Sequence, residues 1–303
     1  MSELLKYVKA HVPFYQKHAG DYPELSGIDE VDRWPVFSKP ELRKHAPHLV
    51  SDEVTKSNSV SFKTSGSTGA PLKGYFAKKD MQFRFQVILA SMVAFGADLR
   101  KSYARFPGHD IAPKGRVYRK DLLNGHYLFS IFHLSSKTAA QYHYALKKHK
   151  VEILEGYPSV LHNLARMFQQ QGLELPDLKY ILTTGEKLHP YQQEDLARIL
   201  DAKVFDYYGS SEGSIFAYTC PQGNIHTANT TGWLEVLDEN EAPVAKGEPG
   251  NMIVTSFTGK FFPLIRYDIG DRCVVAHDQQ CACGTGGMIL EEILGRADRK
   301  KSS

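Results

Sequence analysis

The fold is decided by residues 151–209, which read VEILEGYPSVLHNLARMFQQQGLELPDLKYILTTGEKLHPYQQEDLARILDAKVFDYYG. Three short apolar runs in this stretch predict β-strands, and the two segments between them have the apolar spacing of helices. The expected strands are Val151–Leu154, Tyr180–Leu182 and Val204–Tyr207, and the expected helices are Ser159–Gln171 and His189–Leu200. Because strands that alternate with helices of about 12 residues lie parallel, we expect a parallel sheet with helices on its faces.

The segments before this stretch add helices and one further strand. Asp80–Phe95 and Ser135–Lys148 have helical spacing, whereas Ser59–Lys63 alternates as a strand does. Residues 1–57 are polar and broken by prolines, so that only short helices such as Lys39–His45 fit there. The sequence thus predicts an irregular or helical lead-in over 1–57, followed by an α/β part over 58–218.

Beyond Gly213 the pattern changes to strands alone. Turn-forming clusters such as Asp238-Glu239-Asn240 separate the strand-like segments, and these segments show no helical period. The expected strands are Trp233–Leu237, Met252–Ser256, Leu264–Arg266 and Cys273–Ala276. We therefore expect a β-rich subdomain over 219–294. The predicted fold class is α/β, with mixed, largely parallel sheets flanked by helices plus an antiparallel β subdomain.

The composition excludes several classes of protein. The 303 residues carry 37 basic and 34 acidic side chains, and the net charge of +3 is too small to predict nucleic-acid binding. The longest apolar run, residues 87–97, is too short for a membrane span and is broken by Ser91 and Gly96. Four cysteines are too few for a secreted disulfide framework, and the N-terminus lacks a signal-peptide core. We expect a soluble, cytoplasmic protein that binds neither membrane nor nucleic acid.

The strand at Ser59–Lys63 leads into a glycine- and hydroxyl-rich loop, KTSGSTGAPLK, at residues 63–73. Glycines let the backbone approach a phosphate closely, and the amides and hydroxyls of serine and threonine donate hydrogen bonds to its oxygens. The segment lacks the Gly-Lys-Ser/Thr ending of a Walker A motif. Its spacing alone leaves two interpretations open, a phosphate-binding turn and a flexible surface loop.

Three more motifs follow this loop along the chain. They are Tyr208-Gly209-Ser210-Ser211-Glu212, Arg266-Tyr267-Asp268-Ile269-Gly270-Asp271 and Gly295-Arg296-Ala297-Asp298. Together with Thr64–Gly69 they resemble the core motifs of the AMP-forming adenylate-forming enzymes. Four further segments are similar to the phenylacetate–CoA ligase branch of that superfamily: Thr184–Leu188, Gly156–Ser159, Pro263–Tyr267 and Cys281–Gly284. The resemblance covers most of the chain, from about Ser59 to Asp298.

This resemblance implies a role for each matching residue. Ser65–Gly69 would hold the β- and γ-phosphates of ATP, Tyr208 would stack on adenine, and Asp271 would accept both ribose hydroxyls. Glu212 matches an acidic Mg²⁺ ligand, and Ser211 matches a hydroxyl that faces the α-phosphate. The catalytic residues that the resemblance implies are Thr68, Ser211 and Glu212. The residues that it implies for binding ATP or AMP are Thr64, Ser65, Gly66, Ser67, Thr68, Gly69, Gly185, Glu186, Asp206, Tyr207, Tyr208, Gly209, Ser210, Ser211, Asp271 and Arg296. Without the resemblance, Tyr208 also fits a core aromatic, Glu212 a solvated loop acid and Asp271 a turn residue.

The reaction that the resemblance implies has two halves. A substrate carboxylate attacks the α-phosphate of ATP, pyrophosphate leaves and an acyl-adenylate forms, while Mg²⁺ and the loop donors stabilise the developing charge. The thiol of CoA then attacks the mixed anhydride. Transfer to a carrier-protein pantetheine or an amine, and a nucleotide- or acyl-binding module without turnover, stay open as alternatives. A homodimer is left open as well.

The sequence departs from the family pattern in three places. The loop ends Ala70-Pro71-Leu72-Lys73-Gly74, which displaces its lysine, and the aspartate pair near the hinge is replaced by Asp298-Arg299. In the family a small mobile domain follows the hinge, which corresponds here to residues 295–303, and that domain supplies a lysine used in adenylation. Because the sequence ends at Ser303, we expect a truncated large N-terminal domain that lacks the C-terminal lid domain and is impaired in full turnover. A natural short form stays open as the alternative.

Cys220, His226, Cys281 and Cys283 form a Cys₃His set, which suits a closed structural zinc site. Relatives on this branch often carry such sets. The spacing is less diagnostic than two Cys-x-x-Cys pairs, so reduced cysteines without a ligand stay an alternative. Cys273 lies in an apolar strand and is expected in the core.

A last group of residues falls in segments that border the acid-substrate pocket in relatives. These residues are Phe132, His133, Gly156, Tyr157 and Pro158. Aromatic walls and a glycine floor suit a flat ring, which favours an aromatic acid. His133 fits a substrate contact and a satisfied core histidine equally well.

Overall fold

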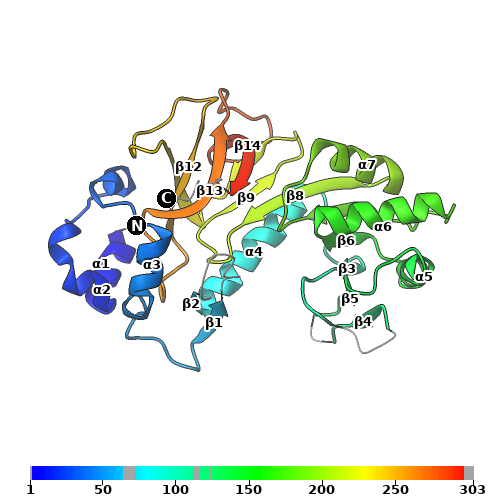
Figure 1. The fold of residues 1–303 in the computed structure, drawn as a ribbon, viewed down its shortest axis with the longest axis horizontal. Helices are drawn as coiled ribbons and strands as arrows, with labels where there is room; N and C mark the ends of the chain where they lie inside the picture. The colour runs from blue at the N-terminus through cyan, green and yellow to red at the C-terminus, as the bar shows by residue number, and fades with distance from the viewer. Residues whose placement is uncertain (1, 64–71, 112–115, 123, 297–303) are drawn as a thin grey trace, which may run out of the picture. The chain divides into compact units, whose positions relative to one another are not determined.

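Figure 1 shows the computed structural model, which describes residues 2–63, 72–111, 116–122 and 124–296. The chain divides into two compact units, one made of residues 1–88 and 209–303 and the other of residues 89–208. Helix α4 (Lys78–Ala94) contains one of the boundaries and confirms the helix expected at 80–95. Over the described part of the chain, no helix has the length and apolar character that crossing a bilayer requires.

The unit of residues 89–208 contains the parallel sheet that the sequence predicts. Its strands lie in the order β8-β7-β6-β3-β5-β4 and pair in parallel, except that β4 pairs with β5 in the antiparallel sense. The strands are β3 (Tyr103–Arg105), β4 (Tyr118–Lys120), β5 (Tyr127–Phe129), β6 (Ile153–Gly156), β7 (Tyr180–Thr183) and β8 (Lys203–Gly209), and the helices are α5 (Ala139–Lys148), α6 (Pro158–Gln170) and α7 (Pro190–Leu200). Every element expected within residues 151–209 is present within two residues of its predicted bounds.

Helix α6 shows how sequence pattern and packing agree in this unit. Pro158 occupies the first turn of the helix, where the missing N–H costs no hydrogen bond. Leu161, Leu164 and Phe168 recur on one face and are completely buried. They belong to one hydrophobic core with Tyr142 of α5 and Ile181 of β7. Burial of each such side chain contributes about 1.5–3 kcal/mol, so the core holds the sheet in place.

Helix α5 begins four residues later than its predicted start at Ser135. The backbone N–H of Ser135 donates to Thr138 Oγ1 at 3.0 Å, and the Thr138 hydroxyl donates to the carbonyl oxygen of His133 at 2.6 Å. Side-chain bonds of this kind give the backbone an alternative to the helix. They therefore delay the helix by one turn.

The strands of the other unit are antiparallel, which was predicted only for those of residues 219–294. β1 (Ser59–Lys63) pairs with β2 (Lys73–Ala77), and six later strands lie in the order β11-β12-β13-β14-β10-β9. These strands are β9 (Phe216–Thr219), β10 (Ile225–Thr227), β11 (Gly232–Leu237), β12 (Pro249–Ser256), β13 (Tyr267–Val275) and β14 (Ile289–Arg296). The strand expected at Leu264–Arg266 is wrong. Arg266 has φ +44°, a left-handed conformation that no strand can contain, and β13 begins one residue later.

Residues 2–57 form helices α1 (Ser2–His11), α2 (Pro13–Lys17) and α3 (Lys39–His45), with 3₁₀ turns at Ala19–Asp21, Ile28–Arg33 and Ala46–His48. Helix α3 has the predicted bounds because Ser38 and Glu41 form a capping box, in which the Ser38 N–H donates to Glu41 Oε2 at 2.9 Å. Phe37 attaches this helix to β13. Its N–H donates to the carbonyl oxygen of Arg266 at 2.8 Å, and the Asp268 N–H donates to the carbonyl oxygen of Phe37 at 3.0 Å.

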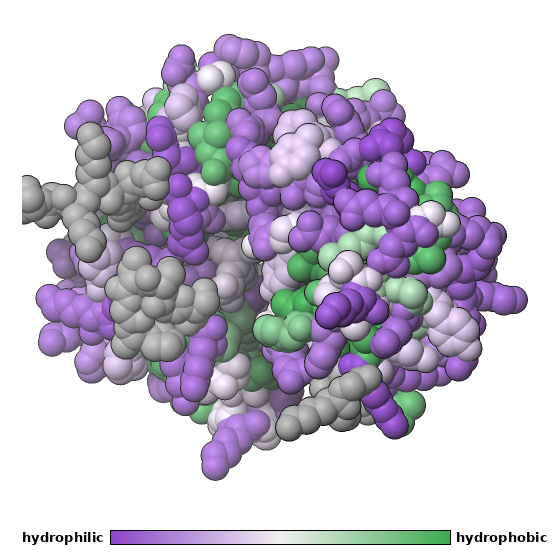
Figure 2. Space-filling model, turned by 45° about the vertical axis from the view of Figure 1, so that its right-hand side comes forward, coloured by the Kyte–Doolittle hydropathy of each residue, from purple (hydrophilic) through white to green (hydrophobic). Residues whose placement is uncertain are grey.

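Figure 2 shows one face of the molecule coloured by hydropathy. Hydrophilic side chains dominate this face, and the hydrophobic ones lie in small separate groups. Such scattered apolar residues are normal for a protein surface. The visible face therefore offers no broad apolar patch.

Candidate functional site

Several predicted site residues lie at the carboxyl ends of strands β6, β7 and β8. Gly156 ends β6, Gly185 follows β7, and Asp206, Tyr207 and Tyr208 lie in the last part of β8. In open parallel sheets, ligands bind at this edge because the loops that follow the strands meet there. Within the unit of residues 89–208, the residues predicted to lie around adenine are therefore at the same end of the sheet.

Gly185 is required by a close approach to Tyr157. Its φ is +80°, and a Cβ placed there would lie 2.7 Å from the Tyr157 ring. No other residue type fits this turn without moving the ring. The predicted nucleotide residue Gly185 and the predicted substrate-pocket residue Tyr157 are therefore in contact.

Glu186 and Asp206 have defined partners at this edge. Glu186 Oε2 accepts a hydrogen bond from the Ser159 N–H at 3.2 Å, at the start of helix α6, where a carboxylate is favoured. Asp206 Oδ1 accepts from Thr183 Oγ1 at 2.5 Å. Burial raises the pKa of Asp206 to about 6, although the Thr183 hydrogen bond opposes the shift.

Glu155, which the sequence analysis did not select, lies beside these residues. Its side chain is almost completely buried and accepts hydrogen bonds from the hydroxyls of Tyr103 and of Tyr207, the latter at 2.8 Å. Arg105 Nε lies 3.1 Å from Glu155 Oε1. Burial raises the pKa of Glu155 to about 7, outweighing the Tyr207 hydrogen bond, which lowers it. The sequence feature that could have pointed to Glu155 is its position as a carboxylate within the apolar run Ile153-Leu154-Glu155-Gly156.

The predicted acyl-pocket residues follow β5 and β6. Phe132 is 62% exposed. His133 Nδ1 lies 2.8 Å from Ser130 Oγ, so this ring has a local hydrogen-bond partner. Pro158 is buried at the start of α6. Tyr157 is half-buried beside Gly185, so at least this predicted pocket residue contacts a predicted nucleotide residue.

The other unit holds the predicted Mg²⁺ ligand. Glu212 is 7% exposed and lies in a turn in which the Gly213 N–H donates to the carbonyl oxygen of Ser210 at 2.8 Å. Ser210 Oγ also lies 2.9 Å from Ser214 Oγ, so it stabilises the turn. Ser211 is exposed, and Gly209 ends β8 with an exposed backbone.

Asp271 and Arg296 form an ion pair in this unit, with Arg296 Nε 3.3 Å from Asp271 Oδ1. The two residues are direct partners across β13 and β14, so the strand register brings them together. Arg296 Nη1 also donates to the carbonyl oxygen of Ile269 at 3.2 Å. Two residues that the family resemblance places at the ribose are therefore neighbours.

The loop residues Thr64, Ser65, Gly66, Ser67, Thr68 and Gly69 lie outside the described residues. Lys63 and Lys73, the described ends of β1 and β2, are paired with each other. The hinge residues after Arg296 are outside the described part of the chain as well.

The four predicted zinc ligands form a compact cluster. The ligand atoms of Cys220, His226, Cys281 and Cys283 all lie within 4.8 Å of one another. Cys220 Sγ is 3.7 Å from Cys281 Sγ, and Cys283 Sγ is 3.4 Å from His226 Nε2. Zn–S bonds of about 2.3 Å at tetrahedral angles place two sulfurs about 3.8 Å apart, so the cluster fits the ion. Cys273 is completely buried in β13 outside the cluster, as predicted.

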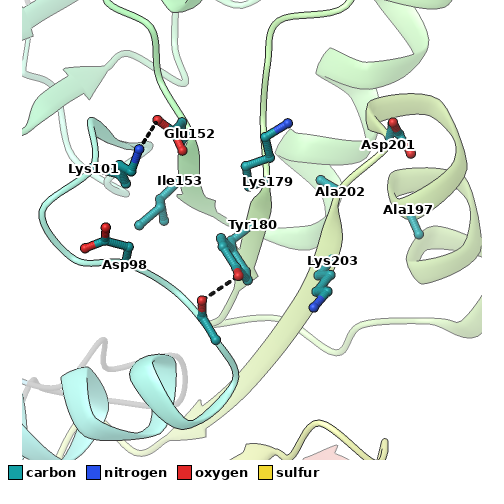
Figure 3. Close-up of a pocket in the computed structure, with 11 residues that line it drawn as sticks. Asp98, Lys101, Glu152, Ile153, Lys179, Tyr180, Ala197, Asp201, Ala202 and Lys203 are labelled. Atoms are coloured by element: carbon teal, nitrogen blue, oxygen red, sulfur yellow. Dashed lines mark hydrogen bonds and ion pairs between the residues drawn. The ribbon is translucent and has the colours of Figure 1, made fainter.

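A cavity of about 580 Å³ lies at the amino ends of the parallel strands, opposite the carboxyl ends described above (Figure 3). Its lining includes Ile153, Tyr180 and Lys203, the first residues of β6, β7 and β8. Lys101 and Glu152 form an ion pair of 3.2 Å on its wall. Because ligands of such sheets bind at the carboxyl ends of the strands, this cavity is separate from the candidate site.

Comparison with known proteins finds a matching protein family and related proteins. The AMP-binding enzyme family matches residues 124–258. The chain is 25% identical to protein CapK of Staphylococcus aureus over 97% of its length, and 26% identical to a phenylacetate-coenzyme A ligase of Thermus thermophilus over 98%. It covers 66% and 69% of those two proteins, and thus spans about two thirds of the curated relatives it matches.

Among solved structures, the chain resembles 2-hydroxyisobutyryl-CoA ligase in an open conformation, in complex with 2-HIB-AMP and CoA. The TM-score is 0.77 at 21% identity, and the match covers 98% of this chain and 73% of the ligase. An anthranilate CoA ligase in complex with anthranoyl-AMP matches with a TM-score of 0.55 at 17% identity, over 81% of this chain and 49% of that one. These likenesses confirm the predicted fold class.

Proposed function

We propose that this chain, which belongs to the AMP-forming adenylate-forming superfamily and its phenylacetate–CoA ligase-like branch, activates a carboxylic acid with ATP. The product is an acyl-adenylate, which is then transferred to the thiol of CoA. The observation that carries the proposal is the meeting of predicted nucleotide residues at the carboxyl ends of β7 and β8. The sequence relative in Thermus thermophilus is itself a phenylacetate-coenzyme A ligase.

Each unit supplies a part of the proposed chemistry. Asp206 and the tyrosines of β8 would surround adenine, and Asp271 with Arg296 would bind the ribose hydroxyls through a carboxylate and its paired guanidinium. Ser211 and Thr68 would donate hydrogen bonds to phosphate oxygens. These roles come from the motif positions, and of these residues Asp206, Tyr207 and Tyr208 lie in the last part of β8.

Glu212 fits the role of Mg²⁺ ligand because it offers a nearly buried carboxylate in a rigid turn. When bound, the ion would neutralise charge on the pyrophosphate as it leaves. Glu212 itself would keep the ion beside the phosphates.

The acid substrate is proposed to be aromatic, because Phe132, Gly156 and Tyr157 fall in segments that border the acid-substrate pocket in relatives. The relatives include ligases named for phenylacetate and for 2-hydroxyisobutyrate, so both classes of acid belong in a test. CoA is the proposed acceptor, and carrier-protein pantetheine or an amine are the competing acceptors. The proposed place of action is the cytoplasm, where ATP and CoA are available.

The experiment is an assay of pyrophosphate release with ATP and Mg²⁺ across aromatic and aliphatic acids, each with and without CoA, a carrier protein or an amine. We expect release that depends on the acid, with an aromatic acid preferred and CoA consumed. Release without any acyl transfer to CoA would move the acceptor to one of the alternatives. Silence across the panel, together with no binding of ATP or AMP, would overturn the proposal.

We also propose that the cluster of Cys220, His226, Cys281 and Cys283 holds a structural Zn²⁺. The S–S and S–N distances support tetrahedral coordination. His226 is completely buried, and its Nδ1 has no partner among the described residues. Four protein ligands would leave no open position on the ion, so it would stabilise the β-rich part of the chain and take no part in catalysis.

A further inference from the structure

Helix α3 carries two cationic side chains in the same unit as Glu212, Asp271 and Arg296. Lys39 and Arg43 are four residues apart and therefore share one face of the helix. The helix contacts β13 (Figure 1), and the backbone of Phe37 is hydrogen-bonded on both sides of Tyr267. The capping box of Ser38 fixes where α3 begins. The position of Lys39 is therefore set by backbone contacts.

The ammonium group of Lys39 is half-buried among the predicted nucleotide residues. Burial lowers its pKa, and the charges of Arg296, Glu212 and Asp271 act on it in that order of strength. Within the described part of the chain, Lys39 makes no hydrogen bond or ion pair with another side chain. An ammonium group loses part of its hydration when it is partly buried, and an anionic partner offsets that cost. Lys39 therefore lacks the partner that its location calls for.

A second unpaired group lies at the same place. The hydroxyl of Tyr267 is completely buried and has no hydrogen-bond partner among the described residues. Glu212, Arg296 and Arg43 are close enough for their charges to act on it. Buried polar groups without a partner are rare in native proteins and mark places where a ligand, an ion or a water completes the structure.

We propose that Lys39 and Arg43, supported by Tyr267, form a subsite for the phosphate group of the bound nucleotide. An ammonium binds phosphate as a point charge, and a guanidinium binds its oxygens through paired hydrogen bonds. The charges of Glu212 and Asp271, the residues proposed above for the metal and the ribose, both act on Lys39. In AMP the phosphate is bonded to the ribose, and in ATP the phosphates also hold the metal, so a phosphate subsite belongs near both residues. The inference rests on the proposed function. It adds the N-terminal helix to the nucleotide site.

The test compares AMP with adenosine, which differ only in the phosphate. Binding of both ligands is measured by calorimetry for the wild type, Lys39→Ala, Lys39→Arg and Arg43→Gln. Lys44→Ala is the matched control, because Lys44 is an exposed lysine on the same helix. Thermal unfolding of each variant reports whether it is folded.

We expect Lys39→Ala and Arg43→Gln to bind AMP about 10- to 100-fold more weakly, as for the loss of a charged hydrogen bond. Their adenosine affinity should equal that of the wild type, Lys39→Arg should recover part of the AMP affinity, and Lys44→Ala should bind both ligands normally. Equal losses for AMP and adenosine, or normal AMP binding by Lys39→Ala, would overturn the subsite and leave the proposed function intact. A wild type that binds neither AMP nor ATP would overturn both.

Discussion

Arg266 Nη1 donates a hydrogen bond to the carbonyl oxygen of Trp34 at 2.7 Å. The same guanidinium forms a fork with the Glu235 carboxylate, at 2.9–3.1 Å. Arg266, the first residue of the Arg266–Asp271 motif, thus binds the N-terminal segment at Trp34, which is 232 residues away in the sequence. Because Phe37 and α3 follow Trp34, this contact helps to place Lys39 beside Glu212.

Replacing Arg266 with alanine should lower the free energy of unfolding by about 3–5 kcal/mol, since Glu235 would keep a nearly buried charge without a partner. Urea denaturation measures the change. Arg198→Ala is the control, because Arg198 pairs with Asp195 on the surface and should cost under about 1 kcal/mol. A loss at Arg266 no larger than that at Arg198 would contradict the structural role.

The raised pKa of Glu155 predicts a pH dependence of stability. In the unfolded chain this carboxyl has its ordinary pKa of about 4.5, whereas in the folded chain its pKa is about 7. Between these values the unfolded state holds fewer protons, so the free energy of unfolding falls as the pH rises and levels off above pH 7. We expect the Glu155 contribution to be about 1–3 kcal/mol.

Glu155→Gln isolates this contribution, because the amide stays neutral and keeps an acceptor for the tyrosine hydroxyls. The variant should gain stability relative to the wild type as the pH rises from about 4.5 to 7.5. Denaturation curves at several pH values give the difference. Parallel pH profiles for the two proteins would show that Glu155 is not the titrating group.

Asp271→Ala should weaken AMP binding by about 1.5–3 kcal/mol, because two charged hydrogen bonds to the ribose would be lost. The measurement is calorimetry with AMP. Asp278→Ala serves as control, since Asp278 is an exposed aspartate outside the proposed site. If AMP affinity is unchanged in Asp271→Ala, the residue does not bind the ribose.

Glu212→Ala should reduce Mg²⁺-dependent pyrophosphate release by about 100-fold, since loss of even a supporting partner of a metal ligand costs about 10- to 100-fold. AMP binding without Mg²⁺ should change far less. The two measurements are made on the same preparation. Equal losses in turnover and AMP affinity would argue against a metal role for Glu212.

Elemental analysis of the purified protein should find about one zinc per chain. Cys283→Ser should lose the metal and unfold at a lower temperature, whereas Cys273→Ala should retain it, because Cys273 lies in the core outside the cluster. Wild-type protein that was never exposed to chelator and contains no zinc would exclude the site.

The parallel sheet could be predicted because its signals are local. The apolar face of α6 and the short strands on either side of it depend on neighbouring residues, and the core only reinforces them. Helix α3 was predictable for the same reason, since Ser38 and Glu41 cap it from within the segment. The motifs selected Asp271 and Arg296 as nucleotide-binding residues, but their ion pair was not predicted and results from the register of β13 and β14.

What the sequence could not predict depends on contacts between distant residues. Leu264–Arg266 is apolar enough for a strand, but the left-handed backbone of Arg266 accompanies its bonds to the N-terminal segment. Glu155 is an ordinary acid in sequence, and only burial against Tyr207 reveals its raised pKa. The place of Lys39 among Glu212 and Asp271 likewise needs the packing of α3 on β13.

Formation of an acyl-adenylate can be measured by isotope exchange between labelled pyrophosphate and ATP in the absence of CoA. This exchange reports the first half-reaction alone and needs no acceptor. We predict exchange that requires Mg²⁺ and depends on the carboxylic acid, with an aromatic acid among the best. If a folded protein that binds ATP shows no exchange with any acid, it does not form an acyl-adenylate.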